Sequence, residues 1–151
     1  MNPEEVLRLS AALARRFEGC YLKPYLCPAG VPTIGYGATR YEDGRRVTLT
    51  DPPITRERAE SLLRANLKQQ FIFATVKLCP GADSEARLAA LVDFAFNLGT
   101  GRLKSSTLRK RVNAGEWDLV PDEFRKWTRG GGRVLRGLVL RREAEVALCS
   151  G

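Results

Sequence analysis

The chain has 151 residues, 44% of them hydrophobic, and a formal net charge of +8 without a single histidine. This length and hydrophobic content predict one folded domain with its own core and exclude a disordered chain. The missing histidine excludes histidine catalysis and histidine metal ligation, whereas the positive charge favours polyanionic partners. The charge is uneven, because residues 102–151 hold 12 Lys and Arg against 6 Asp and Glu.

The first residues lack the basic start and the apolar run of a secretory signal, and no apolar run approaches membrane-spanning length. We therefore expect a protein made in the cytoplasm that reaches any extracytoplasmic target by another route. The four cysteines form no CxxC pair, which argues against a zinc site. The sequence leaves their pairing open, since a cytoplasmic origin favours free thiols and export would permit oxidation. They are Cys20, Cys27, Cys79 and Cys149.

The N-terminal third predicts a helix followed by a small sheet. Asn2 can cap the helix, Pro3 suits its first position, and apolar residues recur at helical spacing as far as Phe17. From 20 to 50, prolines and glycines forbid a long helix. We expect short strands at 31–36 and 45–50, with a hairpin turn at 42–44.

The rest of the chain predicts helices. Thr55 can cap a long helix whose apolar stripe continues to about Leu78, and a helix that starts at Asp83 ends at Gly99. Three further helices are expected at about 105–115, 116–127 and 137–148, with a glycine loop at 130–132. The predicted class is α+β, mostly helical, with one small antiparallel sheet near the N-terminus.

Glu18 is the first candidate for chemistry, because it ends the first predicted helix. The macrodipole is negative there and disfavours a carboxylate. A carboxylic acid that is still protonated near neutral pH is what a glycosidase needs to protonate the leaving oxygen. From position alone, a solvated glutamate at a helix end is the simpler interpretation.

The residues around Glu18 change that interpretation. Cys27 follows nine positions on and Thr33 six further, directly before Ile-Gly-Tyr-Gly at 34–37. This pattern closely resembles the phage-type lysozymes, glycoside hydrolase family 24, which usually carry Asp and sometimes Cys at the second position. The resemblance covers most of the chain. Further matching segments lie at 94–99, 105–108, 124–127, 130–132, 137–138 and 141–142.

The resemblance implies a lysozyme-like fold with a cleft between two lobes, and hydrolysis of the β-1,4 bond between N-acetylmuramic acid and N-acetylglucosamine with inversion. We expect one domain over 1–151. Its parts would be a small β lobe at about 18–54, a connecting helix at about 55–79, and a helical lobe from about 1–17 plus 80–151.

The family also implies a setting. We expect a monomeric endolysin, without metal or cofactor, that accumulates in the host cytoplasm until a holin opens the membrane and then cleaves periplasmic peptidoglycan. The basic C-terminal third would hold an anionic envelope surface, or would simply be a solvated basic face.

The resemblance assigns Glu18 as the general acid, with Cys27 and Thr33 handling the attacking water. Cys27 replaces the usual catalytic Asp, although an inverting glycosidase generally uses two carboxylates. A free thiol has a pKa of about 8.5 and is mostly neutral at pH 7 unless a group such as Lys23 lowers that pKa. Cys27 would therefore activate water as a thiolate or position water as a neutral thiol. The alternatives are a small buried hydrophobe at Cys27 and an ordinary strand residue at Thr33.

Tyr36, Asn97 and Ser106 are the candidate substrate-binding residues. A structural role in a tight turn is favoured for Tyr36, a helix cap for Ser106, and the two interpretations of Asn97 are balanced. Trp117 and Trp127 suit sugar stacking, but they fit core packing better. Arg141 or Arg142 approaches Glu18, and the sequence does not say which.

Three other functions compete with hydrolysis. A lytic transglycosylase would cleave the same bond with one glutamate, but it would need neither Cys27 nor Thr33. A nucleic-acid-binding module fits the charge, yet the arginines are spread over every segment and no binding motif appears. A lysozyme-like structural protein without activity is the third.

Overall fold

The computed structural model describes all 151 residues. The first helix, α1 (Pro3–Phe17), has Pro3 in its first turn, and the Asn2 side chain accepts a hydrogen bond from the Glu4 N–H at 3.0 Å. The expected start of this helix is confirmed, and its last residue is Phe17. Its buried face packs against α4 (Glu85–Leu98), the central helix of the molecule.

A two-stranded antiparallel sheet follows α1. In it, β1 (Tyr21–Leu26) pairs with β2 (Pro32–Gly35), which confirms the strand expected within 31–36. Its partner β1 is not predicted, because Pro24 argues against a strand. The register is irregular between Tyr21 and Tyr25, where Pro24 lies. β1 is an edge strand of this two-stranded sheet, so the missing N–H of a proline is tolerated there.

The strand expected at 45–50 is wrong, since the structure has only an isolated bridge between Arg40 and Arg46 there. The Asp51 carboxylate accepts hydrogen bonds from the Thr48 N–H at 2.9 Å and from the Thr48 hydroxyl at 2.7 Å. Such local side-chain bonds compete with strand pairing and turn the chain instead. The turn at 42–44 is confirmed by Gly44, which has a φ of 86° and donates to the Tyr41 carbonyl at 3.0 Å.

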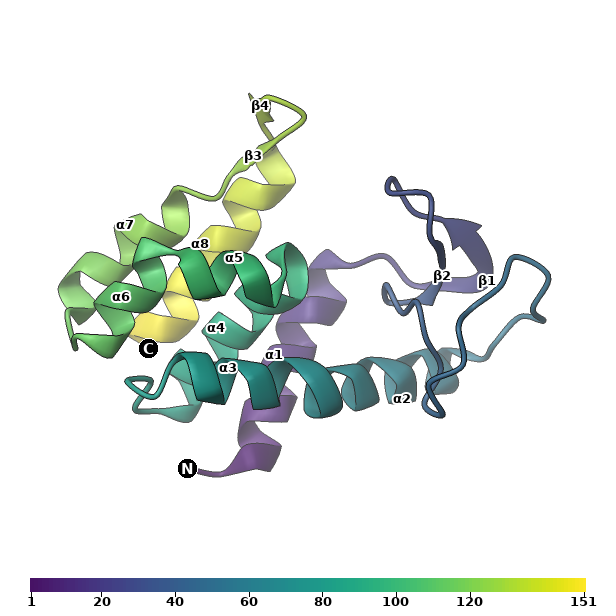
Figure 1. Ribbon diagram of the computed structural model, residues 1–151, viewed down its shortest axis with the longest axis horizontal. Coiled ribbons are helices and arrows are strands. Elements are labelled where there is room, and N and C mark those ends of the chain that lie inside the picture. The colour runs from purple at the N-terminus through teal and green to yellow at the C-terminus, as the bar shows by residue number, and fades with distance from the viewer.

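One long helix connects the sheet to the remaining helices, as Figure 1 shows. It consists of α2 (Arg56–Asn66), the π-helical segment η1 (Leu67–Ile72) and α3 (Phe73–Leu78), which follow without a break. The Thr55 hydroxyl accepts a hydrogen bond from the Arg58 N–H at 3.1 Å, so the expected cap is confirmed. The wide turn of η1 is not predicted, because an apolar period of 3.6 does not mark one extra residue in a turn.

The C-terminal half is helical, with caps close to the expected ones. Ser84, not Asp83, caps α4, and Ser106 caps α6. The short strands β3 and β4 pair with each other and flank the glycine loop. None of the helices is long and apolar enough to cross a bilayer. The elements are α5 (Thr100–Ser105), which is not predicted, α6 (Thr107–Asn113), η2 (Trp117–Leu119), α7 (Val120–Arg125), β3 (Arg129–Gly130), β4 (Arg133–Val134) and α8 (Arg136–Ser150).

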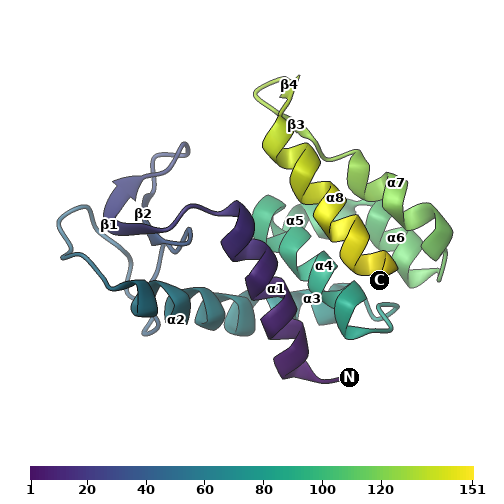
Figure 2. The same ribbon diagram turned by 180° about the vertical axis from the view of Figure 1, so that it is seen from behind.

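The core is built around α4, which packs against both α1 and α8, as Figure 2 shows. Phe94 is fully buried and meets the Trp127 ring edge-on, with ring centroids 5.4 Å apart. Trp117 lies under the Arg87 guanidinium at 4.0 Å. Both tryptophans therefore contribute to packing among the helices, which was the favoured interpretation of the sequence.

The cap of the long helix is testable. Replacing Thr55 with Ala removes the side-chain acceptor of the Arg58 N–H, and we expect the free energy of unfolding to fall by about 1 kcal/mol. Urea denaturation measures it. Ser61→Ala, at an exposed position inside the same helix, is the matched control and should cause no loss. Equal losses in the two variants would contradict the capping role.

Candidate active site

Glu18 is the residue at which α1 ends. Its N–H still donates to the Ala14 carbonyl at 2.8 Å, while its own backbone is already extended, with φ −92° and ψ 140°. Its side chain is 27% exposed. An ionised carboxyl group at this negative helix end is disfavoured unless a cation compensates it.

Arg141 on α8 provides that cation. Its Nη1 donates to Glu18 Oε2 at 2.5 Å, and its Nε and Nη2 donate to the two Asp93 oxygens at 2.9 and 2.8 Å. Arg141 is 3% exposed and Asp93 is fully buried. Burial lowers the pKa of Arg141, but the bonds to Asp93 and Glu18 outweigh burial and raise it above its ordinary value. One guanidinium thus joins α1, α4 and α8.

Arg142, next along α8, points into the helical core instead. It is fully buried, its Nε lies 2.7 Å from Glu145 Oε1, and its Nη2 donates to Asn97 Oδ1 at 2.7 Å. Glu145 is fully buried as well. Because Arg142 holds the amide oxygen of Asn97, the amide nitrogen of Asn97 is left for a ligand.

A polar cleft of about 230 Å³ opens beside Glu18. Gly37, with a φ of 88°, borders the carboxyl group, and a Cβ at this position would lie 3.6 Å from Glu18 Oε1. A second recess of about 370 Å³ along the start of α8 shares Glu18 and Asn97 with the cleft, so Glu18 lies where the two meet. The cleft is lined by Glu18, Gly37, Thr39, Arg40, Asn66, Gln70, Phe71, Phe96 and Asn97.

Cys27 and Thr33 meet at the end of the hairpin. The Cys27 N–H donates to the Val31 carbonyl at 3.1 Å, and the buried Thr33 hydroxyl donates to the same oxygen at 2.8 Å. Hydrogen bonds with the backbone at Val31 and Ala29, and with the Thr33 side chain, lower the pKa of the Cys27 thiol. The thiolate is therefore favoured by local hydrogen bonds, and Lys23 is not among the causes.

Tyr25 on β1 is close enough to both Glu18 and Cys27 for their charges to affect its phenol. Burial raises the pKa of Tyr25, and the neighbouring Tyr21, Glu18 and Cys27 raise it further. The Tyr25 phenol is therefore within electrostatic reach of both groups, Glu18 on the helix side and Cys27 on the sheet side.

Two of the candidate substrate-binding residues lie away from the cleft lining. Tyr36 is only 8% exposed and packs in the core with Ile34 and Ala59. The Ser106 hydroxyl caps α6, accepting from the Arg109 N–H at 3.0 Å and donating to the Leu103 carbonyl at 2.7 Å. Of the three candidates, Asn97 alone lines the cleft.

The sequence prediction missed the residues that line the cleft opposite Glu18. Asn66 and Gln70 come from the end of α2 and from η1, and Thr39 and Arg40 follow the sheet. A signal for the first two was present, because Asn66 and Gln70 interrupt an apolar stripe at a spacing of four and thus share one helix face. No comparable signal marks Thr39 or Arg40.

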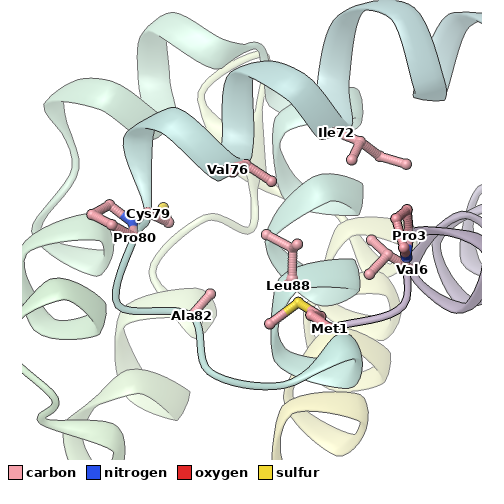
Figure 3. Close-up of a pocket in the computed structure, with 9 residues that line it drawn as sticks. All are labelled: Met1, Pro3, Val6, Ile72, Val76, Cys79, Pro80, Ala82 and Leu88. Carbon is pink, nitrogen blue, oxygen red and sulfur yellow. The ribbon is translucent and has the colours of Figure 1, made fainter.

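A separate cavity of about 280 Å³ lies at the other end of α1 (Figure 3). It is lined mainly by apolar side chains, including Pro3, Val6 and Leu88, with the Cys79 thiol at one side. The length of α1 separates Pro3 from Glu18 by about 20 Å. Burial raises the pKa of Cys79 to about 11, so this thiol stays neutral near pH 7.

The cleft at Glu18, and not the apolar cavity, is therefore the candidate active site. Side-chain amides, an arginine and two phenylalanine rings suit a polar chain with apolar ring faces, as in an oligosaccharide. A carboxyl group held at the edge of such a cleft can pass a proton to a glycosidic oxygen.

The chain is similar to phage endolysins in both sequence and fold. The endolysin of Bacillus phage B103 is 40% identical over 136 residues, which are 90% of this chain and 50% of that protein. The chain therefore spans about half the length of this relative. The solved endolysin from Escherichia coli O157:H7 phage FAHEc1 has a TM-score of 0.82 at 32% identity, covering 94% of this chain and 90% of that chain.

A third relative is the muramidase domain of SpmX from Asticaccaulis excentricus. Its TM-score is 0.78 at 30% identity, covering 95% of this chain and 96% of that chain. The family model described as phage lysozyme matches residues 15–145, which include Glu18 and Arg141. Since this match takes in most of the sequence, the chain belongs to the phage lysozyme family.

Proposed function

We propose that this protein is a muramidase, a lysozyme that hydrolyses the β-1,4 bond between N-acetylmuramic acid and N-acetylglucosamine in bacterial peptidoglycan. The observation that carries the proposal is the Glu18 carboxyl group, which lies in a polar cleft and pairs with the buried Arg141. The names of the relatives, endolysin and muramidase, support the same activity.

Glu18 acts as the general acid. It gives its proton to the glycosidic oxygen while the bond from that oxygen to the anomeric carbon breaks, and Arg141 stabilises the carboxylate that remains. Water attacks the anomeric carbon from the opposite face, with inversion. The Cys27 thiolate accepts the proton of that water, and Thr33 orients it. Asn97 binds the sugar chain through its free amide nitrogen.

The cellular role we propose is that of an endolysin. One domain over 1–151 would comprise a small lobe at about 18–54, a connecting helix at about 55–79, and a helical lobe from 1–17 plus 80–151. It would act as a monomer, stay in the host cytoplasm until a holin opens the membrane, and then reach peptidoglycan. Its positive charge would favour an anionic envelope surface.

Glu18→Gln tests the activity directly. The amide keeps the shape of the side chain but has no acidic proton, so hydrolysis should fall by about a hundred- to ten-thousand-fold. The assay follows the turbidity of outer-membrane-permeabilised cells, and mass spectrometry of digested peptidoglycan distinguishes reducing ends from the anhydro ends of a transglycosylase. Glu57→Gln, an exposed glutamate of α2, is the control. An active Glu18→Gln enzyme would overturn the proposal.

Cys27 is tested by two substitutions. Cys27→Asp restores a carboxylate at this position and should keep activity while it resists thiol reagents. Cys27→Ala should lose about a hundredfold or more of the hydrolysis rate, because no group then holds or activates the water. Cys20→Ala controls for the loss of a thiol nearby. Lysis by Cys27→Ala at the wild-type rate would remove Cys27 from the mechanism.

The four thiols should differ in reactivity. All are free, but burial raises the pKa of Cys79 to about 11 and that of Cys149 to about 12, whereas hydrogen bonds lower the pKa of Cys27. Since the thiolate is the reactive form, iodoacetamide near neutral pH should modify Cys27 well before Cys79 and Cys149. Peptide mass spectrometry at timed intervals measures this order. Equal rates in the folded protein would contradict it, and unfolding in urea should equalise them.

A further inference from the structure

A smaller recess adjoins the cleft on the side of the sheet, where β2 begins. It has a volume of about 180 Å³ and shares Thr39 and Arg40 with the cleft lining. Two of its lining residues are arginines and none is acidic. The recess is lined by Val31, Pro32, Thr39, Arg40, Arg46 and Val47. It is therefore a positively charged extension of the cleft.

The backbone holds the two arginines close together. Arg40 and Arg46 are opposite each other in an isolated antiparallel bridge. The nearest backbone hydrogen bonds lie one residue to either side, and one of them runs from the Val47 N–H to the Thr39 carbonyl at 3.0 Å. In pairs of this kind the Cα atoms are only about 4.5 Å apart and both side chains lie on one face. Like charges placed directly opposite each other destabilise a fold.

No carboxylate of the protein compensates this charge. Both arginines are exposed, Arg40 donates to the Gly44 carbonyl at 2.9 Å, and neither Arg40 nor Arg46 forms an ion pair. The carboxylates nearby in the chain are bound by other groups. These contacts are Glu42 with Arg58, Asp51 with Arg45, and Asp43 with the Arg45 N–H. An anion in the recess would thus meet two guanidinium groups without a carboxylate partner.

The recess lies beside the residues that handle water in the proposed reaction. The carbonyl of Val31, one of its wall residues, accepts the hydrogen bonds from the Cys27 N–H and the Thr33 hydroxyl. In the bond that a muramidase cleaves, the attacked anomeric carbon belongs to N-acetylmuramic acid. This sugar, and not N-acetylglucosamine, would therefore lie next to the recess.

N-acetylmuramic acid differs from N-acetylglucosamine by a lactyl ether, to which peptidoglycan attaches a short stem peptide. The stem peptide carries free carboxylates and the methyl groups of alanine. Guanidinium groups bind carboxylates through charge-assisted, often paired hydrogen bonds. Val31, Pro32 and Val47 offer apolar contacts to methyl groups in the same recess. The recess therefore suits a stem peptide in both charge and polarity.

We propose that Arg40 and Arg46 form a subsite for a carboxylate of the stem peptide, which makes the enzyme selective for glycan strands that carry peptides. The assignment rests on the proposed muramidase function, because that reaction places N-acetylmuramic acid at the recess. The repulsion between the two arginines is then relieved when the substrate binds. Local rules of stability are typically broken in this way at functional sites.

Binding to the Glu18→Gln variant tests the subsite on an uncut ligand. The probe is a tetrasaccharide of alternating N-acetylglucosamine and N-acetylmuramic acid with tetrapeptide stems, prepared with free carboxylates or with the same carboxylates converted to amides. Calorimetry at physiological ionic strength gives both dissociation constants. The free-carboxylate probe should bind about tenfold more tightly. Adding Arg46→Gln should abolish this preference.

Arg56→Gln is the matched control, again in the Glu18→Gln background. It removes the same charge from an exposed arginine at the start of α2 that lines neither the recess nor the cleft, so the preference should remain. Arg46→Gln should leave the midpoint of urea denaturation unchanged or raise it, because a repulsion is removed. A lower midpoint together with a lost preference would assign Arg46 a structural role and overturn the subsite.

The outcomes separate this subsite from the muramidase activity. Equal affinity for the two probes, or an equal loss of affinity for both in Arg46→Gln, overturns the subsite even if the wild-type enzyme releases reducing ends from peptidoglycan. A preference that depends on Arg46, in a protein whose wild type cleaves no glycan, would keep the carboxylate subsite and overturn the muramidase proposal.

Discussion

The site depends on one guanidinium group that two carboxyl groups share. Arg141 bonds Asp93 through two nitrogens and Glu18 through the third, so it fixes the end of α1 against α4 and α8. It is almost completely buried, and removing either Arg141 or Asp93 would leave a charge in the core without its main partner. The position of the Glu18 side chain is therefore a consequence of how three helices pack.

The cleft depends on a second constraint, which is the way the chain returns across the end of α1. The sheet packs against the long helix. Residues from 37–40 and the helix residues Asn66 and Gln70 line the same cleft. A π-helical segment lies at this point, and such wide turns are frequent at functional sites. Here the segment contributes Gln70 and Phe71 to the cleft wall, and Phe71 packs edge-on against Phe96 from α4. The cleft wall is thus continuous with the core.

Sequence patterns predicted those features that depend on interactions between residues close together in the chain. The caps at Thr55 and Ser106 and the end of α1 at Phe17 follow from hydrogen bonds within a few residues. Pairing over long separations was not predictable in the same way. Arg141 reaches Glu18 across 123 positions, and only the packing of α8 decides that it does so rather than Arg142. The wrong prediction of a strand at 45–50 also has a local cause, because the Asp51 side chain accepts a hydrogen bond from the Thr48 N–H.

Two opposing electrostatic effects act on the Glu18 carboxyl group. The end of α1 disfavours a negative charge, whereas an adjacent arginine favours it. Asp93 changes this, because its two hydrogen bonds take up most of the charge of Arg141. Glu18 is then held in place by Arg141, whose positive charge is already largely compensated by Asp93. Asp93 therefore compensates the buried arginine within the core, and this pairing accounts for an aspartate among aliphatic and aromatic neighbours on the buried face of α4.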